Sequence, residues 1–193
     1  TPGLIVHAYE KSAVIQAHPP GMDSDKDTIV EAIKNVFGDD IKNVFYKSEG
    51  TLPFKADIEV KDRYLMGGND VEAVSMENGL KFNIDWLRGQ KTGFFIDQRD
   101  NRSLLEKYSN NRDIVNLFCY TGAFSIYALR GGAKSVVSID SSSKAIMLTE
   151  ENVRLNFEDD NRHTSLSEDA FKYLRDMEND ANDLIILDPP AFA

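Results

Sequence analysis

The sequence has few residues that could form covalent cross-links or metal sites. Its 193 residues include a single cysteine, Cys119, so a disulfide within the chain is excluded. The three histidines, His7, His18 and His163, lie too far apart in sequence to indicate a metal-binding cluster. We therefore expect no metal site, and the shortage of cysteine favours the cytoplasm as the compartment.

Long apolar runs are also missing. No run approaches the ~20 residues that a membrane-spanning helix needs, and the first residues lack the basic-then-apolar pattern of a secretion signal. The apolar fraction of 41% is nevertheless ordinary for a globular protein. The sequence thus predicts a soluble protein without membrane association, built as one ordinary domain or two small ones.

Basic residues are scarce relative to acidic ones. The chain has 22 lysines and arginines against 32 aspartates and glutamates, which gives a formal net charge of −10. Proteins that bind nucleic acid usually present a basic surface or stripe. Any affinity for RNA must therefore come from a local basic face, or from a part of a longer parent protein outside this sequence.

Residues 1–88 have the pattern of a small α+β domain. Two short apolar runs, at residues 4–6 and 13–15, predict strands separated by a polar turn. Apolar residues then recur at helical spacing, and Asp23 and Ser24 are the candidates for the N-cap of that helix.

A β-hairpin is the clearest local feature of this region. Residues 71–76 and 80–84 read as its two strands, and the turn between them contains Asn78 and Gly79. These two residue types readily supply the positive φ angles that a tight hairpin turn requires.

Residues 89–193 change to an alternation of strand and helix. This order predicts an α/β fold in which parallel strands are joined by crossover helices. The predicted strands are residues 114–118, 135–139, 163–166 and 184–187, and the predicted helices are residues 123–130, 144–156 and 168–177.

The turn after the first parallel strand is a candidate ligand site. It contains one glycine, Gly122, just before a predicted helix, and a helix N-terminus favours an anion. Dinucleotide-binding turns use three glycines so that the backbone can approach a pyrophosphate. A single glycine better suits a ligand with one carboxylate, such as the methionine part of S-adenosylmethionine, although a purely structural turn would have the same sequence.

Two acidic residues follow the next two strands. Asp140 ends the strand at residues 135–139, where an acid can accept hydrogen bonds from ribose hydroxyls. Asp169, followed by Ala170, begins a helix and could accept from an adenine amino group. The alternatives are that Asp140 is a helix N-cap and that Asp169 is an ordinary carboxylate in a first helical turn.

The fourth strand is followed by Asp188, Pro189, Pro190 and, one residue later, Phe192. Two prolines directly after a strand predict a rigid loop with no backbone donors. A carboxylate beside such a loop could hold the amino group of a flipped base, and Phe192 could stack on the base.

These motifs, together with the segment at residues 92–102 (TGFFIDQRDNR), resemble bacterial 23S ribosomal RNA (cytosine-5)-methyltransferases over essentially the whole chain. In that family a PUA domain precedes a small α+β domain and a Rossmann-like class I methyltransferase domain. The resemblance implies S-adenosylmethionine as cofactor and ribosomal RNA as partner. The residues it implies near the cofactor are Gln98, Arg99, Tyr120, Thr121, Gly122, Ala123, Asp140, Asp169, Ala170 and Asp188, with Asp188, Pro189, Pro190 and Phe192 toward the target base.

The reaction of that family needs a cysteine thiolate that adds to carbon 6 of cytosine. Cys119 lies in the cofactor turn, where we expect a packed residue, and the family's cysteine comes after the Asp-Pro-Pro motif. We therefore expect a fragment without the PUA domain and the last part of the catalytic domain, inactive on RNA by itself. The strand at residues 184–187 would then be an unpaired apolar edge, through which the chain could self-associate.

Three alternatives remain compatible with these patterns. Guanine-modifying ribosomal RNA methyltransferases share the style of the Asp97-Gln98-Arg99 and Asp-Pro-Pro motifs. A nicotinamide-dependent oxidoreductase is disfavoured by the single glycine of the turn. A module that binds cofactor or RNA without catalysis agrees with the acidic charge and the missing cysteine.

Overall fold

The computed structural model of the chain describes residues 2–52, 60–68, 71, 73–158 and 160–190. The fold has two compact units, and the chain passes from one to the other three times. Residues Thr1–Met76 and Ile84–Phe95 form the N-terminal unit, and residues Glu77–Asn83 and Ile96–Ala193 form the C-terminal unit. Across the described residues, every helix is too short or too polar to span a bilayer.

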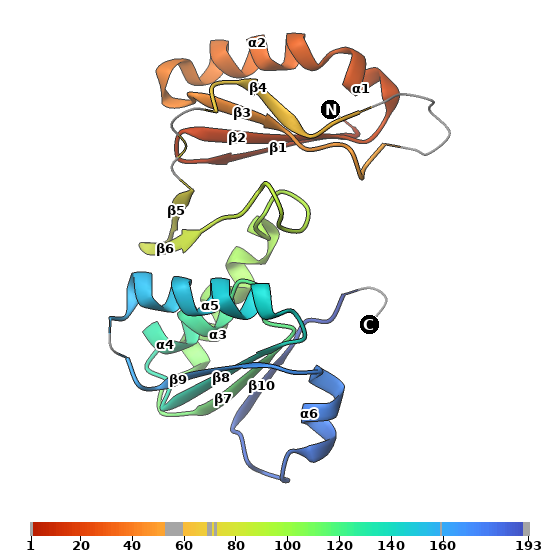
Figure 1. The fold of residues 1–193 in the computed structure, drawn as a ribbon. Coiled ribbons are helices and arrows are strands. Elements are labelled where there is room, and N and C mark those ends of the chain that lie inside the picture. The colour runs from red at the N-terminus through yellow and green to blue at the C-terminus, as the bar shows by residue number, and fades with distance from the viewer. Residues whose placement is uncertain (1, 53–59, 69–70, 72, 159, 191–193) are drawn as a thin grey trace. The chain divides into compact units, whose positions relative to one another are not determined.

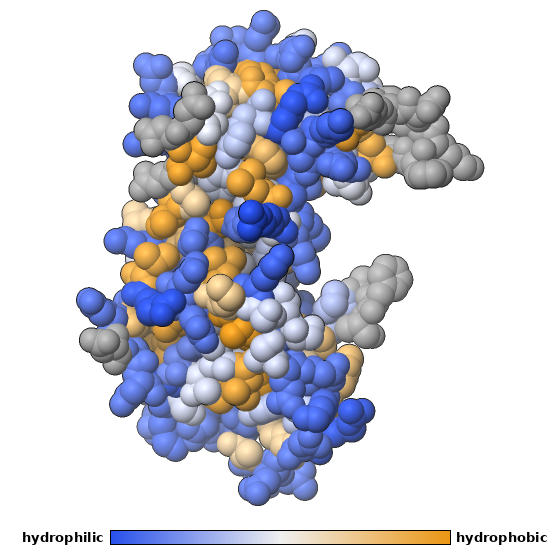
Figure 2. Space-filling view, viewed as in Figure 1, coloured by the Kyte–Doolittle hydropathy of each residue, from blue (hydrophilic) through white to orange (hydrophobic). Residues whose placement is uncertain are grey.

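The N-terminal unit is a four-stranded sheet with one helical layer (Figure 1). Its strands follow the order β1-β2-β3-β4, where β2 and β3 are parallel and the other two pairs are antiparallel. A short α1 and a longer α2 connect β2 to β3, and Figure 2 shows hydrophilic residues over the outer surface of α2. The elements are β1 (Leu4–Tyr9), β2 (Ser12–Ala17), α1 (Pro20–Ser24), α2 (Lys26–Phe37), a 3-10 turn (Gly38–Asp40), β3 (Asn43–Tyr46) and β4 (Arg63–Met66).

Both faces of this sheet are covered, because every residue of β2 and β3 is buried. The helical face packs Ile15 and Val44 against Val30 and Ile33 of α2. The opposite face is covered by the segment Ile84–Phe95. There Trp86 stacks on Tyr9 with ring centroids 6.1 Å apart, and the Thr92 hydroxyl forms hydrogen bonds with Tyr9 at 2.9 Å and His7 at 2.7 Å.

The predicted cap of α2 is wrong. Asp23 and Ser24 lie inside α1, which Pro20 starts early because proline presets the φ angle of a first helical turn. The N-cap position of α2 is Asp25, whose side chain makes no capping hydrogen bond. The Asp23 carboxylate instead accepts a hydrogen bond of 2.6 Å from the hydroxyl of Tyr46.

The predicted hairpin is confirmed. Strands β5 (Val74–Glu77) and β6 (Leu80–Asn83) pair with each other, and both turn residues have positive φ, 51° at Asn78 and 81° at Gly79. These angles match the type of turn that continues the twist of the two strands.

The C-terminal unit is an open parallel sheet with the order β10-β7-β8-β9, and the predicted α/β class is confirmed. Helices α3, α4 and α5 cover one face of this sheet and α6 covers the other (Figure 1). The elements are a 3-10 turn (Ile96–Gln98), α3 (Arg99–Tyr108), β7 (Asp113–Leu117), α4 (Ala123–Arg130), β8 (Ser135–Asp140), α5 (Ser143–Asn156), β9 (His163–Ser167), α6 (Ala170–Asp176) and β10 (Leu184–Leu187).

The two faces of the parallel sheet have different cores. Val115, Leu117 and Ile139 pack against Ala170 at the start of α6. On the face toward α4, buried polar groups are paired with one another, and the Ser138 hydroxyl lies 2.6 Å from that of Ser125. Because neighbouring residues of a strand point to opposite faces, alternate residues of the same strands contribute to the two cores.

Helix α3 is absent from the prediction, for a physical reason. Its sequence is largely charged, and Arg102 is its only buried residue. Its apolar residues are few, and Leu104 and Tyr108 are exposed, so the segment has only a weak pattern of a buried helix face.

Candidate functional site

The predicted site residues follow the carboxyl ends of four neighbouring strands. In the register of the sheet, Leu187 of β10 lies beside Leu117 of β7, which lies beside Ile139 of β8. All four strands are parallel, so the segments that follow them leave the sheet at the same edge (Figure 1). These segments carry Gly122 after β7, Asp140 at the end of β8, Asp169 after β9 and Asp188 after β10.

The turn between β7 and α4 has an unusual backbone. Phe118, Tyr120 and Gly122 have φ values of 57°, 48° and 73°, a region that side chains disfavour. Such strain persists only where the surroundings impose it, and it is common at ligand sites. A Cβ atom at Gly122 would lie 2.4 Å from Cγ2 of Thr149, so both the backbone angle and the available space require glycine.

The turn leads directly into helix α4, whose first backbone N–H groups have no partner within the helix. Thr121 and Ala123 are buried on either side of Gly122, and the Gly122 N–H closes the turn on the Cys119 carbonyl at 2.8 Å. The result is a tight, fixed backbone bend at a helix N-terminus, which is suited to an anionic group.

Asp140 joins the end of β8 to this turn. One carboxylate oxygen accepts from the Tyr120 N–H at 3.0 Å, and the other accepts from the Ser142 N–H at 2.9 Å. A carboxylate has about four lone-pair positions, so capacity for ligand hydroxyls remains. The N-cap of α5 is Ser142, whose hydroxyl accepts from the Ala145 N–H, so the alternative interpretation of Asp140 as a cap is not realised.

Asp169 lies just before α6 and not in its first turn, where the alternative interpretation had placed it. It is the N-cap of α6, and its carboxylate accepts from the Lys172 N–H at 2.7 Å, while Ala170 is buried. Phe171, 46% exposed, packs edge-to-face against Phe118 of the turn with centroids 5.6 Å apart. An open hollow beside these residues is lined by Asp169, Phe171, Lys172, Leu174 and Arg175.

The segment after β10 is exposed. Asp188, Pro189 and Pro190 are all accessible, and they directly follow Leu187, which pairs with Leu117 at the end of β7. Phe192, the predicted stacking residue, lies outside the described residues.

Gln98 and Arg99 lie at the start of α3. The Gln98 side chain accepts a hydrogen bond of 2.8 Å from Asn101, and the Arg99 Nε donates to Glu77 at 3.1 Å. Arg102, one turn along the same helix, lies 6.0 Å from the ring of Phe124 in the first turn of α4. The structure thus relates this segment to the turn between β7 and α4 through the packing of α3 on α4.

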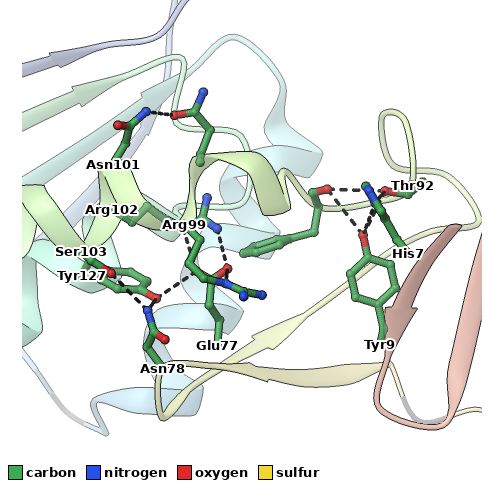
Figure 3. Close-up of polar contacts among 12 residues, drawn as sticks. His7, Tyr9, Glu77, Asn78, Thr92, Arg99, Asn101, Arg102, Ser103 and Tyr127 are labelled. Atoms are coloured by element: carbon green, nitrogen blue, oxygen red, sulfur yellow. Dashed lines mark hydrogen bonds and ion pairs between the residues drawn. The ribbon is translucent and has the colours of Figure 1, made fainter. Parts of the chain in front are cut away.

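Glu77 pairs with two arginines and a tyrosine in the C-terminal unit (Figure 3), and no pattern in the sequence indicated these contacts. Its buried carboxylate accepts from Arg102 Nε at 2.8 Å, Arg102 Nη2 at 2.7 Å, Arg99 Nε at 3.1 Å and the Tyr127 hydroxyl at 2.9 Å. Burial by itself would raise the pKa of Glu77, but these donors, Arg102 first, hold the pKa below its ordinary value. Burial and the adjacent Glu77 raise the pKa of Tyr127 to about 12.

Cys119 is packed inside the turn, as expected. It is 7% exposed, and its Sγ lies 3.8 Å from the Thr149 hydroxyl. Burial raises the pKa of its thiol to about 12, and the nearby Asp140 charge acts in the same direction. The only thiol of the chain therefore has the opposite environment from that of a reactive cysteine.

The sequence also did not identify the side chains that support the turn from α5. Thr149 and Asn152 are fully buried, on the face of α5 that also buries Ile146 and Val153. Polar residues at the core positions of an amphipathic helix are the pattern that could have revealed them.

Among the described residues, no group of three or more histidine, cysteine or carboxylate side chains could hold a metal ion.

Comparison with known proteins relates this chain to one family. A profile of the family described as S-adenosylmethionine-dependent methyltransferase matches residues 58–193. Ribosomal RNA large subunit methyltransferase I of Alteromonas mediterranea is 38% identical over 193 residues, which are 99% of this chain and 48% of that protein. The chain thus spans about half the length of the curated relatives it matches.

Solved structures resemble the fold over nearly the whole chain. A candidate SAM-dependent methyltransferase from Streptococcus mutans has a TM-score of 0.82 at 26% identity, covering 98% of this chain and 49% of that one. A second candidate methyltransferase, solved in complex with SAH, has a TM-score of 0.81 at 26% identity and covers 97% of this chain and 48% of that one.

Proposed function

Since the chain belongs to the family of S-adenosylmethionine-dependent methyltransferases, we propose that the carboxyl edge of its parallel sheet is the methyl-donor site of an enzyme that modifies large-subunit ribosomal RNA. S-adenosylmethionine is the cofactor of this family, as the sequence predicts. The observation that carries the proposal is the hydrogen bond between the Asp140 carboxylate and the Tyr120 N–H, which joins the strained turn to the end of the next strand.

The residues at this edge fit the chemical parts of that cofactor. The cradle at Gly122, which a Cβ atom would fill, and the N–H groups of the first turn of α4, which have no partner within the helix, suit the carboxylate of the methionine part. Asp140 suits the ribose hydroxyls. Asp169 and Ala170, beside the hollow of α6, suit the adenine. Tyr120, Thr121 and Ala123 complete the turn, and we assign Gln98 and Arg99 a place near it through the packing of α3.

The bound cofactor supplies an electrophilic methyl group. The chain's own residues hold the cofactor in place, because the rigid turn and Asp140 bind two separate parts of it. The methyl group is therefore already positioned when the target base binds. Asp188, next to the donor-free loop of Pro189 and Pro190, can accept a hydrogen bond from an exocyclic amino group of a base. We extend this substrate role to Phe192, whose ring could stack on the base.

The proposed target is carbon 5 of a cytosine in large-subunit ribosomal RNA. The name of the Alteromonas mediterranea relative supports the RNA, and the resemblance of residues 92–102 and of the Asp-Pro-Pro loop supports the base. This chemistry needs a thiolate, and the only cysteine of these 193 residues is buried with a raised pKa. The proposal therefore assigns the cysteine to a part of the enzyme outside this sequence, and it assigns no transfer to RNA to this chain alone.

A guanine-modifying ribosomal RNA methyltransferase is the second candidate, because it would need no cysteine. The two candidates differ in the base that receives the methyl group.

We also propose that β10 mediates self-association, because among the described residues it pairs with β7 only and exposes Ile185 and Leu187.

Cofactor binding is tested by thermal unfolding of the chain with S-adenosylhomocysteine (SAH), the demethylated cofactor. A ligand at 100 times its Kd stabilises the folded state by about 2.7 kcal/mol, so a clear rise in Tm is expected. NAD⁺ at the same concentration should give no rise. Stabilisation by NAD⁺ and not by SAH would overturn the assignment in favour of an oxidoreductase.

The RNA target is tested with a hybrid protein, in which this chain replaces the matching half of the Alteromonas mediterranea relative. Labelled methyl groups are then followed from S-adenosylmethionine into large-subunit ribosomal RNA, and the modified nucleoside is identified after digestion. We expect 5-methylcytosine from the hybrid and no label from the 193-residue chain alone. Label in guanine would favour the second candidate.

A further inference from the structure

Two fully buried polar side chains of α5, Thr149 and Asn152, face the turn that precedes α4. The Thr149 hydroxyl donates to the Tyr120 carbonyl at 2.9 Å, and the Asn152 Nδ2 donates to the Thr121 carbonyl at 3.0 Å. Two consecutive carbonyl groups of the turn are therefore held by one helix. Since each peptide group is planar, fixing a carbonyl also fixes the direction of the following N–H group.

The same Asn152 side chain also holds the hairpin. Its Oδ1 accepts from the backbone N–H of Asn83 in β6 at 2.6 Å. The Asn152 amide group thus accepts a hydrogen bond from β6 and donates one to the turn. Both contacts lie inside the C-terminal unit, which contains Glu77–Asn83 together with α4 and α5.

Asn156, one helical turn later, provides a comparison. It accepts from the Lys81 N–H at 2.8 Å and donates to the Lys81 carbonyl at 2.7 Å. Its side chain therefore pairs with β6 as a neighbouring strand would. In the described structure, none of its hydrogen bonds reaches the turn. Asn152 and Asn156 together dock β6 on α5, but only Asn152 connects the docked strand to the turn.

We propose that Asn152 is a positioning residue for the methyl-donor turn, which its side-chain amide links to β6. The inference rests on the proposed function, because it assigns the turn to the cofactor. An asparagine suits this place because it has a donor and an acceptor on one short planar group. Aspartate keeps the acceptor for Asn83 and loses the donor for Thr121, whereas alanine loses both.

The experiment compares Asn152→Ala and Asn152→Asp with the matched control Asn156→Ala in the full 193-residue chain. Backbone hydrogen exchange of the turn and of β6 is measured without ligand, and SAH affinity is measured by calorimetry. If the buried charge of Asn152→Asp prevents folding, Asn152→Ala still tests the contact with the turn.

We expect faster exchange across residues 118–123 in both Asn152 variants and an unchanged turn in Asn156→Ala. At Asn83, exchange should become faster in Asn152→Ala and stay slow in Asn152→Asp. The SAH Kd should rise about 5- to 10-fold in the Asn152 variants, the equivalent of one lost buried hydrogen bond. It should stay within about twofold in Asn156→Ala, which loses no bond to the turn.

Two results would overturn the inference: unchanged exchange of the turn in the Asn152 variants, or an equal loss of SAH affinity in Asn152→Ala and Asn156→Ala. Absence of SAH binding by the unmodified chain would instead reject the proposed cofactor site. The exchange measurement needs no ligand, so the two failures are distinguishable.

Discussion

The carboxylate of Asp140 accepts a hydrogen bond of 3.0 Å from the backbone N–H of Tyr120, twenty residues earlier in the chain. This contact joins the end of β8 to the strained turn after β7. Asp140 therefore holds the turn in place and can also accept from the ribose of a ligand in the proposed site.

Replacing Asp140 with alanine should abolish most of the stabilisation by SAH. The variant loses the contact to Tyr120 and the acceptor for the ribose, so we expect the rise in Tm with SAH to fall below one third of its original size. The control is Asp113→Ala, at the amino end of β7, where the carboxylate binds Lys134 and Ser135. Its response to SAH should be unchanged, and equal losses in the two variants would argue against the site.

Gly122→Ala should destabilise the chain and weaken SAH binding. The new Cβ atom would combine a φ of 73° with a 2.4 Å approach to Thr149, so we expect a loss of about 2–4 kcal/mol in the free energy of unfolding, measured with urea. Gly79→Ala is the matched control, since Gly79 has a φ of 81° and no neighbour within 4 Å. It should lose only about 1 kcal/mol.

A second change tests whether the clash is the cause. Thr149→Ser removes Cγ2 and keeps the hydroxyl that binds the Tyr120 carbonyl. In the Gly122→Ala background it should restore part of the lost stability. No restoration would mean that backbone strain, and not crowding against Thr149, determines the need for glycine.

The alternation of strand and helix was sufficient to predict the parallel sheet, because buried strands and amphipathic helices leave distinct periods in the sequence. It also placed Gly122 and Asp140 at strand ends, where parallel topology brings segments to one edge. The pairing of Glu77 with Arg102 was not predictable, because 25 residues separate them and neither belongs to an apolar pattern. The polar pattern of α5 could have marked Asn152 as unusual, but its hydrogen-bond partners could not be predicted, because they depend on which backbone groups the fold brings to it.

The outer edge of β10, which among the described residues pairs with β7 only, should make the chain self-associate. Ile185 and Leu187 are 46% and 55% exposed on this strand, so we expect the sedimentation coefficient to rise with protein concentration. Ile185→Lys should reduce that rise, because a lysine on an edge strand opposes pairing. Met147→Lys, at an exposed apolar position on α5, serves as the control. A monomer at all concentrations would reject the proposal.

Cys119 should be unreactive in the folded chain. With a thiol pKa raised to about 12 by burial, the thiolate fraction at pH 8 is on the order of one in ten thousand. Labelling with a disulfide reagent at pH 8 should therefore be at least about 100-fold slower in the native state than in urea. Rapid native labelling would show that the turn opens, and would make Cys119 a possible nucleophile again.

Glu77→Gln should be strongly destabilising, because it removes the negative charge that pairs with the buried Arg102 guanidinium, which is 2% exposed. Breaking a buried ion pair in this way costs about 3–5 kcal/mol, which urea unfolding at pH 7 would measure. The control is Glu106→Gln. Glu106 pairs with Arg130 at 2.7 Å but is partly exposed, so its loss should cost about 1 kcal/mol or less.

The same ion pair predicts a pH dependence with a definite sign. The pKa of Glu77 is lower in the folded chain than its ordinary value, so its contribution to stability is fully present above the unfolded pKa of about 4.3. That contribution declines as the pH falls from there through the folded pKa. Urea midpoints between pH 7 and pH 3 should fall more steeply for the unmodified chain than for Glu77→Gln. Parallel curves for the two proteins would mean that Glu77 is not held ionised by Arg102.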